Sequence, residues 1–106
     1  MEKKIEWSKS AENNLKNIFD YIANDSEIYA TRFLTKLVQY TESELVNYPF
    51  IGKKVAEFEN TYLERLREII FKGYRIVYEP ETTQSQITIV AVLKGRKSIR
   101  KHMQLD

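Results

Sequence analysis

Apolar residues recur at two different spacings and divide the chain into a helical half and a strand-rich half. In the first half they recur every three or four positions, which predicts two amphipathic helices. The inner positions are Ala11, Leu15, Ile18, Phe19, Ile22 and Ala23, and then Ala30, Phe33, Leu34, Leu37, Val38, Thr41 and Leu45. Ser8 is a suitable N-cap for the first helix, while Pro49 and Gly52 end the second. The short polar link at 23–27 predicts an antiparallel helix hairpin.

The period changes to two in the second half. Residues 63–71, 74–79 and 86–94 are rich in β-branched and aromatic side chains and are separated by turn residues, which predicts a three-stranded antiparallel meander. Residues 3–7, "KKIEW", predict an opening strand at one edge of the sheet, and the helix pair is expected to cover one face. The expected fold class is α+β: an N-terminal strand, an antiparallel two-helix hairpin and the meander, all in one domain over residues 1–106.

The two strands at 63–71 and 74–79 can be placed in register if Lys72 and Gly73 form a two-residue turn. The expected cross-strand pairs are Ile69 with Ile76, Arg67 with Tyr78, Ile70 with Arg75, and Glu68 with Val77. One face is then aliphatic and aromatic and should lie under the helices. The other face is mixed, and Arg75 and Glu68 are expected to be exposed on it together. Arg75 is therefore either a cross-strand partner of Glu68 or a cation on an anion-binding sheet face.

The amino-acid composition argues against several kinds of disulfide, metal and cofactor site. The sequence contains no cysteine, so it predicts neither a disulfide nor a thiolate metal site. His102 is the only histidine, and no cluster of carboxylates accompanies it, so neither a metal nor a cofactor is expected. The N-terminus has no apolar stretch typical of a signal peptide, and no run approaches the length of a membrane span. A cytoplasmic protein that does not bind membranes is the expectation.

Positive charge is concentrated at the C-terminal end. The net charge is only +2, but residues 94–101, "KGRKSIRK", contain five cations and no acid: Lys94, Arg96, Lys97, Arg100 and Lys101. Most of the Asp and Glu residues lie in the helical half. This asymmetry predicts that the basic segment binds an acidic or anionic partner. The alternative is a solvated C-terminal segment with no binding role.

The common catalytic motifs are missing from the sequence: it has no cysteine nucleophile, Gly-rich phosphate loop, HExxH or GxSxG. Ribonucleolytic cleavage stays open because it requires only cations, a base and an acid. Arg75, Arg96 and Lys94 could supply the charge, and His102 could supply the acid or base, unless it is an exposed residue without a role. Arg65 and Arg67 are interpreted as structural or peripheral charges.

The order of these parts resembles the ParE/RelE toxin superfamily of type II toxin–antitoxin systems. The resemblance rests on "SKSAENNLKNIFDYIANDSEIYATRFLTKL", "ELVNYPFIGKKVAEF", "RLREIIFKGYRIVYE" and "ITIVAVLKGRK", and spans residues 5–97. It implies a toxin that is neutralised by a cognate antitoxin. Either a homodimer or a toxin–antitoxin hetero-oligomer is compatible with the resemblance.

Members of this superfamily differ in target. The RelE-like branch cleaves mRNA on the ribosome with basic residues of the sheet, whereas the ParE-like branch, the plasmid stabilisation type, poisons DNA gyrase. Arg75 and Arg96 match arginines of the RelE-like branch, and His102 falls where that branch has a tyrosine. Leu66 and Glu68, however, occupy the positions of its two strand lysines, and a carboxylate there opposes phosphate chemistry. The resemblance therefore favours a ParE-like gyrase poison. The alternatives are a RelE-like endoribonuclease and an inactive toxin-like binding protein.

Overall fold

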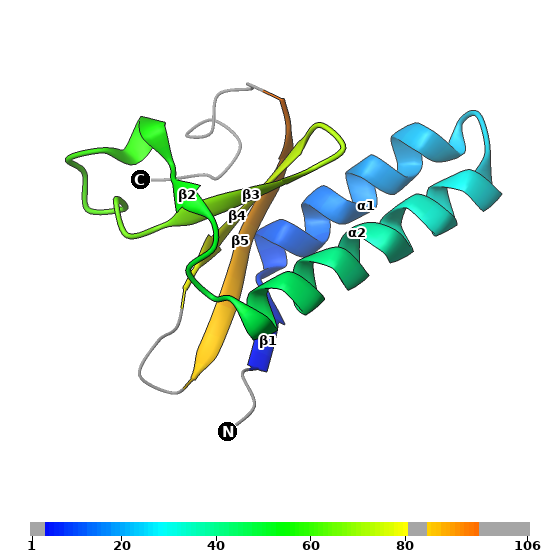
Figure 1. Cartoon of the computed structure of the whole chain (residues 1–106). Coiled ribbons are helices and arrows are strands. Elements are labelled where there is room, and N and C mark those ends of the chain that lie inside the picture. The colour runs from blue at the N-terminus through cyan, green and yellow to red at the C-terminus, as the bar shows by residue number, and fades with distance from the viewer. Residues whose placement is uncertain (1–3, 81–84, 96–106) are drawn as a thin grey trace.

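Figure 1 shows a five-stranded sheet with a helix pair on one face and an irregular segment on the other. The computed structural model describes residues 4–80 and 85–95 of the 106-residue chain. In chain order its elements are β1 (Lys4–Trp7), α1 (Lys9–Ala23), α2 (Glu27–Asn47), β2 (Lys53–Lys54), the short 3₁₀ helix η1 (Ala56–Phe58), β3 (Arg67–Phe71), β4 (Tyr74–Glu79) and β5 (Gln86–Lys94).

The strands are ordered β1-β5-β4-β3-β2 across the sheet. β1 runs parallel to β5, and the other neighbouring pairs are antiparallel. The predicted α+β class, the meander and the edge position of the opening strand are confirmed. The strand β2, which pairs with the start of β3, was not predicted from the sequence. Its two residues are exposed lysines, so no alternation of apolar positions could reveal it.

Both helices begin at serine caps. The Ser8 hydroxyl oxygen accepts a hydrogen bond from the Ala11 amide at 3.0 Å, as predicted, and Ser26 caps α2 in the same way through Tyr29. The Ser8 hydroxyl also donates to the Val90 carbonyl, so the cap fixes the start of α1 against β5. The core on this side is formed by buried residues of both helices and the sheet: Ala11, Ile18, Phe33, Leu37, Leu45, Ile69, Tyr74, Ile76, Tyr78, Ile87, Ile89 and Val92.

The other face of the sheet is covered by residues 55–66, here called the covering segment. Its buried side chains and those of the sheet beneath form a second cluster: Val55, Phe58, Leu63, Leu66, Val77, Ala91 and Leu93. The prediction of a strand from residue 63 was wrong for 63–66, since β3 begins at Arg67. There the Leu66 amide donates to the Leu63 carbonyl at 3.0 Å, and this turn directs both leucines onto the sheet.

The β3–β4 hairpin has the predicted register. Ile69 pairs with Ile76 and Ile70 with Arg75 across a two-residue turn. The two turn residues, Lys72 and Gly73, have φ angles of 47° and 87°, as a type I′ turn requires. The sheet's bulge lies between β4 and β5 instead, so it leaves this register unchanged.

Candidate functional site

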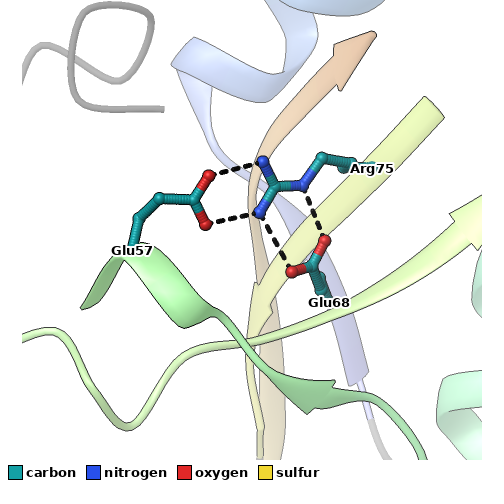
Figure 2. Close-up of polar contacts among 3 residues, drawn as sticks. All are labelled: Glu57, Glu68 and Arg75. Carbon is teal, nitrogen blue, oxygen red and sulfur yellow. Dashed lines mark hydrogen bonds and ion pairs between the residues drawn. The ribbon is translucent and has the colours of Figure 1, made fainter. Parts of the chain in front are cut away.

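Arg75 lies near the start of β4 and points into the space beneath the covering segment. Its Nε donates to Glu68 Oε1 at 2.7 Å, and its Nη2 donates to Glu68 Oε2 at 3.0 Å. The two Nη atoms also donate to the two carboxylate oxygens of Glu57, each at 2.8 Å. Figure 2 shows the guanidinium plane held between the two carboxylates, one from η1 and one from β3. These three residues are called the Arg75 triad below.

The expectation that Arg75 and Glu68 are exposed together was wrong. Their exposed fractions are 8% and 4%, because the covering segment lies over this face of the sheet. Their predicted cross-strand pairing is present, with Glu57 as a further partner. The hydrogen bonds that Arg75 donates to Glu57 and to Glu68 raise the pKa of Arg75 above its already high ordinary value. One cation between two carboxylates gives the triad a net negative charge, which is unfavourable for phosphate.

Arg67 and Arg65 make their contacts near the ends of the sheet. Arg67 Nη1 donates to the Gly52 carbonyl at 2.6 Å, and its guanidinium lies 5.3 Å from the centre of the Phe50 ring. Arg65 is exposed and pairs with Glu79 at 2.8 Å. Both arginines therefore hold neighbouring parts of this chain, and their interpretation as structural or peripheral charges stays a prediction.

Tyr78 also holds the backbone at Gly52, the residue that Arg67 contacts. Its hydroxyl oxygen accepts a hydrogen bond from the buried Gly52 amide at 2.9 Å. Burial raises the pKa of Tyr78 above its ordinary value, and the bond from Gly52 opposes this in part. Tyr78 therefore favours its neutral form in the folded protein.

A Tyr78→Phe variant is expected to lose about 1–2 kcal/mol of unfolding free energy near neutral pH, because the Gly52 amide loses its buried acceptor. The difference from the wild type should shrink as pH rises above about 10, where the unfolded phenol ionises more readily than the folded one. Urea unfolding of both proteins from pH 7 to 11 measures this. A difference that stays constant over that range would contradict the assignment.

Lys94 is the one member of the basic segment that the structure describes. Arg96, Lys97, Arg100, Lys101 and His102 lie outside the described residues, so the predicted grouping of Arg75 with Arg96 and His102 is not tested. The Lys94 ammonium lies 5.9 Å from the centre of the Tyr21 ring and 5.7 Å from that of Tyr74. It borders a cavity of about 360 Å³ between α1 and the end of β5, called the Lys94 cavity, whose lining includes Asn14, Asn17, Tyr21, Tyr74, Val92 and Lys94.

Two further features of the described residues bear on function. Within residues 4–80 and 85–95, no group of three His, Asp or Glu side chains is arranged to hold a metal ion. None of the helices in the same part of the chain has the length and apolar character needed to cross a membrane.

Neither the role of Glu57 nor the α1 wall of the Lys94 cavity was predicted from the sequence. Glu57 lies in an irregular segment and is 18 residues away from Arg75 along the chain, so no periodic pattern connects them. Asn14, Asn17 and Tyr21 are separated by three and four residues, which places them on one face of α1. That spacing was visible in the sequence, but nothing in it showed that β5 ends beside this face.

The comparisons with known proteins agree with this architecture. A family model described as "ParE toxin of type II toxin-antitoxin system, parDE" matches residues 5–99. A search of curated protein sequences found no match.

Solved structures share the fold at low sequence identity. The chromosomal ParDE system from P. aeruginosa matches with a TM-score of 0.69 and 13% identity, covering 89% of this chain and 97% of the other. The toxin–antitoxin complex RelBE2 from Mycobacterium tuberculosis matches with a TM-score of 0.65 and 16% identity, covering 89% and 99%. A mutant of the E. coli toxin RelE in the free state matches with a TM-score of 0.58 and 13% identity, covering 97% and 94%. Because the family model spans nearly the whole chain, as the sequence resemblance implied, the protein belongs to the ParE toxin family of type II toxin–antitoxin systems.

Proposed function

We propose that this ParE-family toxin arrests growth by binding and poisoning DNA gyrase in the cytoplasm, and that a cognate antitoxin neutralises it. The observation that carries the choice of target is the Arg75 triad. Arg75 matches an arginine that the RelE-like branch uses against RNA, yet here four hydrogen bonds from its guanidinium go to Glu57 and Glu68. Four of its five N–H donors are thus already used within the protein.

Electrostatics supports this choice. Cleavage of RNA needs positive groups close to the phosphate, where negative charge develops in the transition state. A scissile phosphate at the Arg75 triad would meet two carboxylates for one guanidinium. It would also have to displace the covering segment, whose apolar side chains pack on Val77, Ala91 and Leu93. A toxin that acts by binding avoids both costs and needs no cofactor.

A RelE-like endoribonuclease is the second candidate. It is favoured by the likeness in fold to RelBE2 and RelE and by the sequence positions of Arg75, Arg96 and His102. In that case the basic side chains would act on mRNA at the ribosome. An inactive toxin-like binding protein is the third candidate.

An antitoxin partner is proposed from the family and from the ParDE and RelBE2 complexes among the similar structures. We further propose that Lys94, Arg96, Lys97, Arg100 and Lys101 contribute to target binding, as the charge pattern suggests. A homodimer and a toxin–antitoxin hetero-oligomer are both compatible with this function.

Induced expression of the toxin without antitoxin separates the three candidates. Growth arrest with DNA breaks and continuing translation is expected, and a His102→Ala variant should arrest growth as the wild type does. Rapid loss of translation with cleaved mRNA, abolished by His102→Ala, would establish the nuclease instead. No arrest from a folded protein, checked by circular dichroism, would establish the inactive form.

A further inference from the structure

We infer that the Lys94 cavity is the specificity-determining part of the target-binding surface, and that it receives a carboxylate side chain from an acidic segment of the target protein. This inference rests on the proposed function and adds to it. The basic segment supplies charge, whereas the cavity supplies a shaped site with Lys94 on one side and α1 residues on the other.

The charge of the cavity calls for an acidic ligand. Within residues 4–80 and 85–95, no carboxylate forms an ion pair with Lys94, and none of the described lining residues is acidic. In the sequence, Arg96 and Lys97 follow Lys94 almost directly. An ammonium that has no carboxylate partner in the described part of the chain and borders a recess is well placed to pair with an incoming carboxylate.

The polar lining offers a second contact. Asn14 is already engaged, because its side-chain oxygen accepts a hydrogen bond from the Val92 amide at 2.9 Å. Asn17 lies nearly one turn further along α1, is exposed and lines the same cavity. Its side-chain amide can donate to a carboxylate oxygen that Lys94 leaves free. The cavity thus combines a cation with a neutral donor from another element.

The aromatic walls explain why this lysine differs from others on the surface. Tyr74 is fixed in the core, where its ring packs edge-on against Phe33 with 5.6 Å between the two ring centres. Tyr21 is 69% exposed, although large aromatic rings favour burial. The two rings hold the ammonium by cation–π attraction and limit the freedom it loses on binding. A partner that covers Tyr21 would bury an aromatic side chain of the type enriched in interface hot spots.

Lys72 provides a matched control. Its ammonium also lies over an aromatic ring, 5.7 Å from the centre of Phe71, and its side chain is exposed. It occupies the β3–β4 turn and is not among the residues that line the Lys94 cavity. Charge reversal at Lys72 therefore changes the net charge of the toxin as much as charge reversal at Lys94 does, without altering the cavity.

The test compares Lys94→Glu, Tyr21→Ala and Lys72→Glu with the wild type. Circular dichroism confirms folding, biolayer interferometry measures affinity for purified gyrase, and induced expression measures growth arrest. Lys94→Glu should weaken gyrase binding by about thirtyfold or more, and Tyr21→Ala by about tenfold. Lys72→Glu should change it by less than about threefold. Affinity for the cognate antitoxin should remain within a similar threefold range in all three variants.

The outcomes test the cavity inference and the proposed function separately. If wild-type toxin binds gyrase and Lys94→Glu binds no worse than Lys72→Glu, the cavity inference is wrong and the proposed function stands. Loss of antitoxin binding alone in Lys94→Glu would also overturn it, because the cavity would then serve the antitoxin. If wild-type toxin does not bind gyrase, the proposed function fails. Growth arrest then tests the cavity. If Lys94→Glu no longer arrests growth and Lys72→Glu still does, the inference holds for another target; any other result overturns it.

Discussion

An Arg75→Ala variant is expected to lose about 3–5 kcal/mol of unfolding free energy, which is the usual cost of leaving a buried charge without its partner. Glu68 is only 4% exposed, and both of its carboxylate oxygens accept hydrogen bonds from Arg75. Truncation of Arg75 removes these donors and opens a space beneath the covering segment. Urea unfolding followed by circular dichroism measures the loss. Domains of this kind have only about 5–15 kcal/mol of stability, so the variant should unfold at far lower urea concentrations.

A paired substitution distinguishes charge burial from simple loss of packing. The double variant Glu68→Leu with Arg75→Met replaces the inner ion pair with apolar side chains, and Glu57 can turn toward solvent, since its side chain is 40% exposed. Buried ion pairs replaced in this way are often neutral in stability. The double variant should therefore be more stable than Arg75→Met alone. Additive losses from the two substitutions would contradict the coupling in the Arg75 triad.

A Gly52→Ala variant is expected to lose about 3 kcal/mol of unfolding free energy, at the upper end of the usual cost of overpacking. A Cβ atom at Gly52 would lie 2.6 Å from the Glu68 carbonyl oxygen and 2.7 Å from the Tyr78 hydroxyl oxygen. The carbonyl belongs to β3, and the Tyr78 ring is buried, so neither can move without disturbing the sheet. The shift would also stretch the hydrogen bond that the Gly52 amide donates to Tyr78 and the one that Arg67 donates to the Gly52 carbonyl. Thermal and urea unfolding both measure this effect.

Gly73 is the matched control for Gly52. It has a φ angle of 87°, and a Cβ atom built there meets nothing within 4 Å. A Gly73→Asn substitution should therefore cost less than about 1 kcal/mol, because asparagine tolerates a left-handed turn conformation. If Gly52→Ala were no more destabilising than Gly73→Asn, the close approach of Gly52 to β3 and Tyr78 would be wrong.

Gly52 and the Arg75 triad are connected by one continuous path of the chain. The loop at Gly52 leads into β2 and then into η1, which carries Glu57. Tyr78 and Arg67 fix the start of this path, and the apolar side chains of the covering segment fix its end. The segment that places Glu57 beside Arg75 is therefore anchored at both its start and its end. The sheet face that carries Glu68 and Arg75 is therefore part of the protein interior.

The β3–β4 hairpin shows how much of a structure a local sequence pattern can predict. Alternating side chains and one two-residue turn were enough to predict each pair between Arg67–Tyr78 and Ile70–Arg75, because a shift by one residue would turn every apolar side chain to the wrong face. The same pattern failed at residues 63–66. Leu63 and Leu66 fit a strand by composition, but they lie in a turn that packs on the sheet.

The sequence by itself determined the α+β class, the helix hairpin and its caps, the hairpin register and the resemblance to the toxin family, since each depends on residues close together in the chain or on their order. Only the tertiary structure decided that Arg75 is buried and neutralised, and that Lys94 borders a cavity with Tyr21. Strand alternation shows that a sheet has two faces, but it cannot show that an irregular segment covers the second one. Glu57 and Tyr21 reach their partners through folding alone, so their roles could not be read from local spacing.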